Sequence, residues 1–227
     1  MATTVTYKGS TLTTVDNQTK VLETAGTWME DDLTLVDVSG GGGYTIDEIA
    51  STEPSGAITI TTPTIRNYAF YENDFITSLR TNGTTKIGTG SFRNCSEMVS
   101  VDLSGVTEVG SNTFSDSAKL TTINVPDMVK VDNQAFRACK LTGTLKLPNL
   151  TSGGGNQTFG NNTLLTKVYF YKTISMNYQQ NLFGGCTGIT DIYVPWSSGA
   201  VSGSPWGASN ATIHYDTTYD SNGEPIV

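Results

Sequence analysis

Three cysteines and one histidine are the residues most able to carry chemistry in this 227-residue chain. Cys95, Cys139 and Cys186 could bind zinc or form a disulfide, but they are 44 and 47 residues apart, two units of the repeat described below. If each repeat adds one strand to a stack, two repeats separate the sulfurs by roughly 10 Å. A disulfide needs Cα atoms within about 7 Å, and zinc needs each thiolate about 2.3 Å from a common ion. We therefore predict buried core thiols, with no metal and no cofactor.

The acid–base residues also give little support for an enzyme. His214 could serve a catalytic triad, but its segment "ATIHY" lies outside the repeats, so we expect an ordinary residue of a C-terminal cap. Glycosidases need two carboxylates about 5–10 Å apart. On the strand face predicted below, Asp102 and Asp191 lie four repeats apart, or roughly 19 Å. A hydrolase with a site on loops stays open as an alternative, with the acid pairs Glu72/Asp74 or Asp31/Asp32.

An aromatic residue returns at nearly constant spacing and indicates the elements that must position these side chains. The steps between successive phenylalanines are 22, 22, 22, 23 and 24, at Phe70, Phe92, Phe114, Phe136, Phe159 and Phe183. Such a return is typical of a repeat architecture. Apolar residues nine and eleven positions after each Phe alternate with polar ones, which predicts a short strand with one buried face. One strand per repeat in the same phase predicts a continuous parallel ladder through Leu79, Val101, Ile123, Leu145, Val168 and Ile192.

Other columns of the repeat predict how each coil is filled. Apolar residues recur six positions after the Phe, with Leu141 replacing the apolar residue where Thr142 breaks the pattern. Aliphatic residues also recur five before it, although Gly154 and Tyr178 in the last two units predict a looser convex side. The third position after the Phe holds only Asn, Cys or Ser. These types suit a buried ladder in which the side chain contacts backbone groups of the adjacent coil.

The run Phe, two residues, Cys or Asn, then Leu, V-x-L-P and I-x-x-x-A-F resembles the BspA-like leucine-rich repeat family, over roughly Ile58 to Pro195. The resemblance implies a repeat solenoid with a parallel β ladder and a short helical or irregular convex side. We divide the chain into a small β attachment or oligomerisation module (1–39), a Gly hinge (40–43), an N-terminal cap (44–57), six repeats (58–195) and a C-terminal cap and tail (196–227). The final "DTTYDSNGEPIV" is expected to be loose.

The layout of the chain resembles virion proteins of phages and prophages of gut Gram-positive bacteria. It combines a β module, a Gly hinge, "YTIDEIA" and repeats that begin "ITITTPTIRNYAF". The resemblance implies a tail, baseplate or fibre component for host recognition, made in the host cytoplasm and joined to other tail proteins through residues 1–39. A homotrimer would fit by analogy with tail fibres. The start "MATTVTYKGS" has no basic and apolar run, so no Sec signal is predicted.

The alternative is a bacterial surface adhesin or a general protein-interaction module, located at the cell surface. Net charge is −8 without a Lys/Arg cluster, which predicts no nucleic-acid partner. The sequence has no stretch of 18 apolar residues, which predicts no membrane span.

The outward side of the predicted strands is the candidate binding face. The first coils supply small polar and charged residues, and the last two supply tyrosines, followed by Trp196 and Trp206. Exposed aromatic residues beside Asn, Asp and Lys suit recognition of sugar rings or protein loops, so a host-surface glycan or protein is the expected ligand. Alternatively, the tryptophans are cap core and the tyrosines are ordinary half-exposed strand residues. The candidate residues are Arg80, Asp102, Asn124, Lys146, Lys167, Tyr169, Tyr171, Asp191 and Tyr193.

Overall fold

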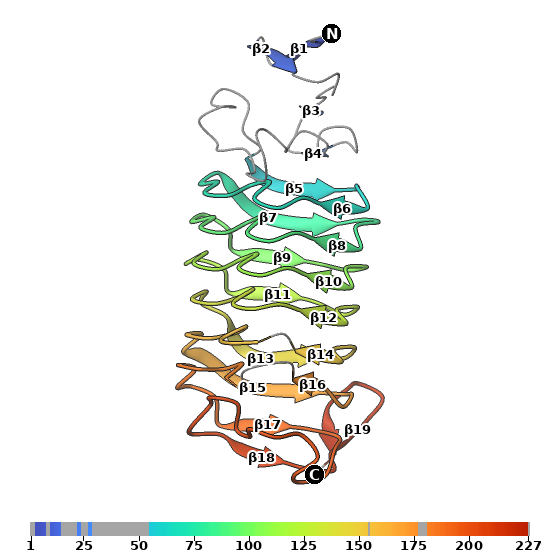
Figure 1. Cartoon of the computed structure of the whole chain (residues 1–227), viewed down its shortest axis with the longest axis vertical. Helices are drawn as coiled ribbons and strands as arrows, with labels where there is room; N and C mark the ends of the chain where they lie inside the picture. Colours follow the sequence, from blue (N-terminus) through green and yellow to red (C-terminus); the bar gives the residue numbers. More distant parts are fainter. Residues whose placement is uncertain are drawn as a thin grey trace.

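The structure is a parallel β-solenoid whose coils stack along one axis (Figure 1). This computed structural model describes residues 55–153, 155–175 and 181–226 in full, together with the backbone of Met176 and of four short strands in the first 28 residues. Each central coil contributes one strand to a front ladder and one to a back ladder. The coils stack in register because each coil buries apolar residues at the same repeat positions against the next coil.

The front ladder carries the predicted strand face and is divided between two sheets, in which the strands of the coils run parallel. The first contains β5 (Gly56–Ile60), β7 (Ile76–Thr81), β9 (Ser100–Asp102) and β11 (Thr122–Asn124), and the second contains β13 (Thr142–Leu147), β15 (Leu164–Phe170), β17 (Asp191–Tyr193) and β18 (Thr212–His214). In the first sheet, Leu79 pairs with Val101, which in turn pairs with Ile123. In the second sheet, Leu145 pairs with Val168, which in turn pairs with Ile192. The predicted alignment of the coils is therefore confirmed within each sheet.

The prediction of one continuous front ladder is wrong at a single step, because β11 and β13 belong to different sheets. In this coil Leu141 is buried, as predicted, and Thr142 is exposed. The chain then turns through Gly143 at φ 68°, a left-handed conformation that favours glycine. Residues 142–144 all point to solvent, and β13 pairs with β15 through a register shift after Gly143. The turn follows Thr142, the first residue of β13, and lies where pairing between β11 and β13 is lost.

The back ladder is continuous across that step. Its six two-residue strands are β6 (Thr64–Ile65), β8 (Lys86–Ile87), β10 (Glu108–Val109), β12 (Lys130–Val131), β14 (Ser152–Gly153) and β16 (Ser175–Met176). The convex side of the described coils is irregular, one of the two forms expected, and left-handed turn residues such as Asn94, Asp116 and Asn161 follow the Phe and turn the chain sharply. Gly153 pairs with Val131, whereas Gly154 and Tyr178 lie outside the described residues.

The phenylalanines form one stacked column through the core. Successive ring centroids lie 4.8, 5.4, 5.1, 5.4 and 5.8 Å apart, and all six rings are buried. The predicted ladder three residues after the Phe is also confirmed, since side chains there donate hydrogen bonds to a Phe carbonyl of the preceding coil. The described donors are Cys95, Ser117, Cys139, Asn162 and Cys186. The bond from Cys139 to Phe114 spans the step where the front ladder is interrupted.

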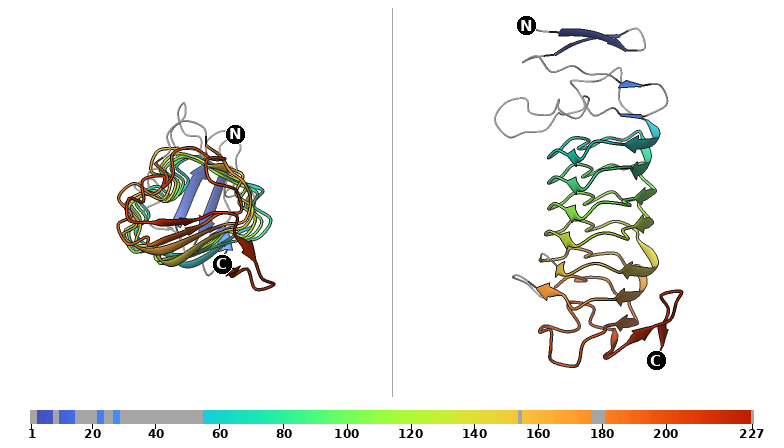
Figure 2. Two further views of the ribbon diagram at one scale, coloured as in Figure 1. Left: turned by 90° about the horizontal axis from the view of Figure 1, so that it is seen from below. Right: turned by 90° about the vertical axis from the view of Figure 1, so that its right-hand side faces the viewer.

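The C-terminal segment differs from the predicted cap and loose tail. A further coil follows the six Phe units, in which Phe183 N donates to Trp206 O at 2.9 Å and β18 adds a strand beside β17. The predicted loose tail is wrong, because β19 (Thr218–Tyr219) and β20 (Pro225–Ile226) pair as an antiparallel hairpin. Figure 2 shows this hairpin beside the C-terminal end of the front ladder. We call residues 216–226 the C-terminal hairpin.

The N-terminal β module is described only as backbone strands. β1 (Thr3–Tyr7) and β2 (Ser10–Thr14) are antiparallel, and their register places them on either side of the predicted Lys8-Gly9 turn. β3 (Leu22–Glu23) pairs with β4 (Thr27–Trp28), which runs parallel to β5. The predicted Gly hinge at 40–43 and the helix of the cap lie outside the described residues. The domain division therefore stays a prediction.

Candidate binding face

The strand face has two halves with different surfaces. We call the outward residues of β7, β9 and β11 the open half, and those of β13, β15, β17 and β18 the covered half. In the open half, Asp102 accepts hydrogen bonds from Ser104 Oγ at 2.7 Å and Asn124 Nδ2 at 2.9 Å, with Arg80 Nε 3.6 Å away. The hydrogen bond from Ser104, helped by Asn124 and Arg80, lowers the pKa of Asp102. Three of the candidate residues therefore form one polar row across adjacent coils.

The covered half contains the predicted tyrosines, but two of them are not exposed. Tyr169 is 4% exposed and Tyr193 is 8% exposed, so the expectation that they face solvent is wrong. The C-terminal hairpin contributes to this burial, since its Tyr219 ring lies 6.2 Å from the Tyr169 ring and stacks on Tyr171 with centroids 4.2 Å apart, while Tyr193 packs against Tyr169. The Tyr219 hydroxyl donates to Phe170 O at 2.8 Å and lies 3.2 Å from Tyr193 O. Burial raises the pKa of Tyr219 above its usual value.

Polar contacts join the tip of the hairpin to the same half. Lys146 Nζ lies 2.6 Å from Glu224 Oε1, and this hydrogen bond raises the pKa of Lys146 and lowers that of Glu224. Tyr169 OH donates to Glu224 Oε2 at 3.3 Å. Tyr171 OH donates to Gly223 O at 2.6 Å. Three candidate residues predicted to bind a ligand thus already contact a segment of their own chain.

Asp191 and His214 form a pair on adjacent strands of the covered half. His214 Nε2 lies 2.8 Å from Asp191 Oδ1, and this hydrogen bond lowers the pKa of Asp191. The His214 ring stacks on Tyr193 with centroids 4.3 Å apart. A triad requires a hydroxyl bound to the imidazole, whereas Thr190 donates to the carboxylate of Asp191. His214 is therefore a ladder residue on β18 instead of the predicted cap residue, and the pair aligns the last two coils.

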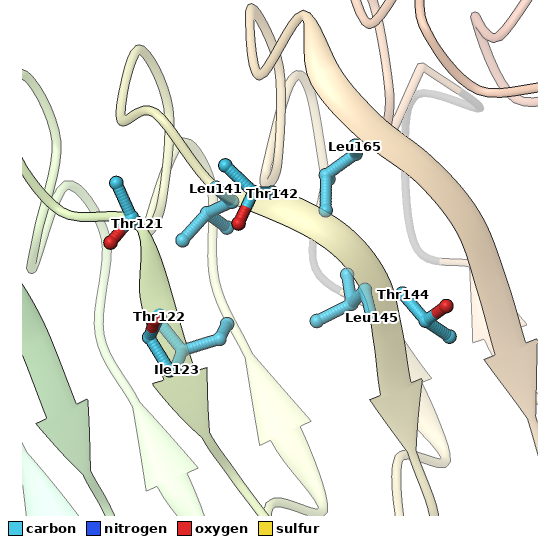
Figure 3. A pocket seen from close by; sticks show the side chains of 8 residues that line it. All are labelled: Thr121, Thr122, Ile123, Leu141, Thr142, Thr144, Leu145 and Leu165. Atoms are coloured by element: carbon cyan, nitrogen blue, oxygen red, sulfur yellow. The ribbon is translucent and has the colours of Figure 1, made fainter.

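A notch separates the two halves where the front ladder is interrupted (Figure 3). Its volume is about 80 Å³, enough for a small apolar group but not for a further strand. Thr142 N donates to Thr121 O at 3.1 Å and Asn149 Nδ2 donates to Pro126 O at 2.8 Å, so hydrogen bonds before and after the two strands still join these coils. Aliphatic side chains form its inner wall and threonines its rim. The lining residues are Thr121, Thr122, Ile123, Leu141, Thr142, Thr144, Leu145 and Leu165.

The remaining predictions concern the cysteines, the tryptophans and Lys167. All three cysteines are buried and free, as predicted. Burial raises the pKa of Cys95 to about 12 and that of Cys186 to about 11, so the reactive thiolate is disfavoured. Trp196 and Trp206 are buried, which confirms the alternative interpretation of these two as core. Lys167 lies in register with Asp191 and is partly buried.

The repeated coils, parallel ladders and stacked aromatic core define a leucine-rich-repeat solenoid. The family model described as the BspA type leucine rich repeat region matches six copies over residues 63–190. Because this match covers more than half of the chain, the protein belongs to the BspA-type leucine-rich repeat family.

Comparison with solved structures agrees with this fold. A leucine-rich repeat protein of T. pallidum is 19% identical, with a TM-score of 0.52, over 67% of this chain and 73% of that chain. A leucine-rich cell surface protein of Faecalibacterium prausnitzii is 13% identical, with a TM-score of 0.32, over 74% and 81%. The likeness to the T. pallidum protein shows the fold alone. A comparison with curated proteins gives no significant match.

The described residues offer neither a membrane-spanning helix nor a metal-binding cluster. They contain no helix that is long and apolar enough to cross a membrane. Within the same part of the chain, no three His, Cys, Asp or Glu side chains gather closely enough to hold a metal ion.

Proposed function

We propose that this protein is a non-enzymatic binding module, of the kind used in bacterial surface adhesion or protein interaction, and that its strand face recognises a macromolecular partner. The observation that carries the proposal is the open half. There, one coil after another presents polar side chains on a rigid strand ladder, with Arg80 and Asn124 exposed. Solenoids characteristically bind through such extended surfaces.

The chemistry of the open half suits a protein or a glycan that offers hydrogen-bonding groups. The row combines the guanidinium of Arg80, the carboxylate of Asp102 and the amide of Asn124, so donors and acceptors alternate across adjacent coils. The notch next to this row adds a small apolar recess. Side chains placed on strands need little reorganisation on binding, which favours specific recognition.

A direct test uses the fluorescently labelled chain with a panel of intact Gram-positive bacterial cells and a glycan array. Changing Asp102 and Asn124 to Arg replaces a carboxylate and an amide of the open half with cationic donors. We expect this double change to reduce binding at least about tenfold. The matched control is Lys119→Glu, because Lys119 pairs with Glu97 on an exposed turn of another side of the coil. Equal binding by the folded face variant and the wild-type chain would contradict the proposal.

A second candidate function is host recognition in a phage tail, at the virion surface. The observation that favours it is the order of parts, in which short β strands such as the β1–β2 pair precede the solenoid. In that setting, residues 1–39 would attach the chain to other tail proteins, and a trimer would bring several strand faces to the host surface. Electron microscopy of virions labelled with antibody against this chain tests the idea, and absence of label from particles would leave the surface or interaction module as the function.

A further inference from the structure

The C-terminal hairpin contacts the solenoid without joining either ladder. Among the described strands, β19 and β20 hydrogen-bond to each other and form a sheet of their own. Among the described residues, the backbone–backbone hydrogen bonds between the hairpin and the solenoid come from its base, from Asp216 N to Trp196 O and from Thr217 N to Val194 O. Beyond this base, the hairpin is bound to the face by the side chains of Tyr219 and Glu224 and by the carbonyl of Gly223. It therefore lies on the covered half much as a separate peptide would.

Its contacts have the composition of a ligand in a binding site. An aromatic ring stacks on Tyr171, a peptide carbonyl accepts the hydroxyl proton of that same tyrosine, and a carboxylate binds Lys146. Charge is complementary as well. The hairpin carries Asp216, Asp220 and Glu224 without a basic residue, while the face supplies the ammonium of Lys146. Charge-assisted contacts around an aromatic anchor are common where protein loops are recognised.

The solenoid does not depend on the hairpin for its own framework. The Phe column and the ladder from β13 to β18 contain no residue of the hairpin. The hairpin itself is a two-residue ladder, and such a short hairpin has little stability of its own. Its ion pair with Lys146 is solvent-exposed on both sides, and exposed ion pairs contribute little. Displacement of the hairpin would leave the core intact and expose more of Tyr169 and Tyr171, while the His214 ring would still cover one face of Tyr193.

We propose that the covered half is a receptor site for an acidic, tyrosine-bearing loop of a partner protein, and that the C-terminal hairpin occupies this site as a displaceable internal ligand. The partner loop would place an aromatic ring on Tyr171 and a carboxylate near Lys146, as Tyr219 and Glu224 do. These observed contacts favour a protein loop over a sugar, because they use a peptide carbonyl and a carboxylate. The proposal rests on the proposed function, since it names the partner of one half of the strand face.

The test uses the full chain with Tyr219→Ala and Glu224→Ala together, which removes the two side-chain anchors of the hairpin. The probe is a fluorescein-labelled peptide with the sequence of residues 215–227, YDTTYDSNGEPIV, measured by fluorescence anisotropy. Freed from its internal competitor, the variant should bind the peptide at least about tenfold more tightly than the wild-type chain. Adding Lys146→Glu to the variant should reverse this gain. A control peptide with alanine in place of Tyr219 and Glu224 should bind neither chain.

Several results would overturn this proposal. Equal peptide affinity of the variant and the wild-type chain, with an unchanged far-UV spectrum, would make the hairpin a permanent structural element. Binding of the variant to a glycan array without binding to the peptide would assign the site to sugars. If the double variant does not fold, Glu224→Ala alone serves, because Glu224 is exposed and its loss should still raise peptide affinity. Cell binding through Asp102 and Asn124 is measured separately, so failure here leaves the proposed function standing.

Discussion

The open and covered halves of the strand face share one coil geometry and present opposite surfaces. In the open half, Arg80, Asp102 and Asn124 form a polar row in contact with water. In the covered half, Tyr169 and Tyr193 occupy equivalent columns but are buried, Tyr169 beneath a hairpin from the end of the chain and Tyr193 against the His214 ring. The repeat determines where the backbone runs and leaves the outward residues free to vary. One scaffold can therefore carry two surfaces with different partners.

The two halves meet at the interrupted ladder, and the interior compensates for the missing strand pairing. The Phe114 and Phe136 centroids are 5.1 Å apart across this step, as close as within either half. β10, β12 and β14 remain paired behind it. The halves are thus joined by the core and by the back ladder, while the front is free to open into a notch.

The largest predicted effect concerns this shared core. Phe114→Ala removes the ring on one side of the step, and loss of a buried Phe typically costs about 3–5 kcal/mol. Because the column is continuous, both halves should lose stability in one transition. Urea unfolding of a Trp28→Phe background measures this, with far-UV circular dichroism for the whole chain and fluorescence of Trp196 and Trp206 for the C-terminal coils.

The control for this change is Phe75→Ala, which alters a ring that is 53% exposed and should shift stability by less than about 0.5 kcal/mol. If the two probes of the Phe114→Ala chain report different midpoints, the halves unfold separately and the core does not couple them.

A smaller effect should separate the hairpin from the solenoid. Tyr219→Ala removes the stack on Tyr171 and two hydroxyl contacts, and we expect the local opening free energy of the hairpin to fall by about 2 kcal/mol. Global stability should change little, because the hairpin lies outside the ladders. Hydrogen exchange of the Gly223 and Glu224 amides, which donate hydrogen bonds to Asp220, measures the local opening free energy of the hairpin.

Tyr219→Phe is the matched variant, since it keeps the ring and removes only the hydroxyl, at a cost of about 1 kcal/mol. A loss of global stability equal to the local loss in Tyr219→Ala would show that the hairpin and the coils open as one unit.

The coils were predictable from the sequence because burial repeats with the chain. Phe92 and Phe114 are separated by one repeat, and Val101 and Leu103 alternate with polar residues. The buried positions of one coil therefore predict the buried positions of the next. The buried hydrogen-bonding ladder through Cys95 and its equivalents was predictable for the same reason. Side-chain types of this kind repeat only where the environment repeats.

The surface of the covered half was not predictable in this way. Its contacts join residues far apart in the sequence, such as Lys146 and Glu224, 78 residues apart, and none of the other described coils has an equivalent hairpin. A local pattern did exist, since Asn222-Gly223 between short β-prone runs is typical of a hairpin turn. The further strand also left a trace, because Ile213 of "TIH" follows Ile192 of "DIY" at nearly the repeat length. Where such a hairpin packs depends on tertiary contacts that periodicity does not encode.

The interrupted step itself gives the next prediction. Gly143 has φ 68°, and a Cβ built there would meet no atom within 4 Å, so Gly143→Ala tests backbone conformation alone. We expect a loss of about 1–2 kcal/mol, because left-handed backbone is unfavourable for alanine. Gly143→Asn should lose less, since Asn tolerates this conformation. Thermal unfolding measures both.

Gly56 offers an internal check on the same idea. It has φ 73°, no atom near its Cβ position, and a register shift immediately after it in the pairing of β5 with β7. Gly56→Ala should therefore lose about as much stability as Gly143→Ala. No loss in either variant would mean that the left-handed turn is not what displaces the start of the strand.

The smallest predicted effect is the pH dependence that Asp102 contributes in the open half. The folded pKa of Asp102 is lowered, chiefly by Ser104, so its contribution to stability is complete above the unfolded value of about 3.9 and is lost as pH falls through the folded value. Asp102→Asn should therefore cost less than about 1 kcal/mol at pH 7 and almost nothing near pH 2. Urea unfolding at the two pH values gives the difference, with Asp127→Asn as the matched control on a neighbouring turn. A cost that persists unchanged at low pH would show that Asp102 stabilises the fold through packing. The charge of the polar row would then contribute little to the difference between the two halves.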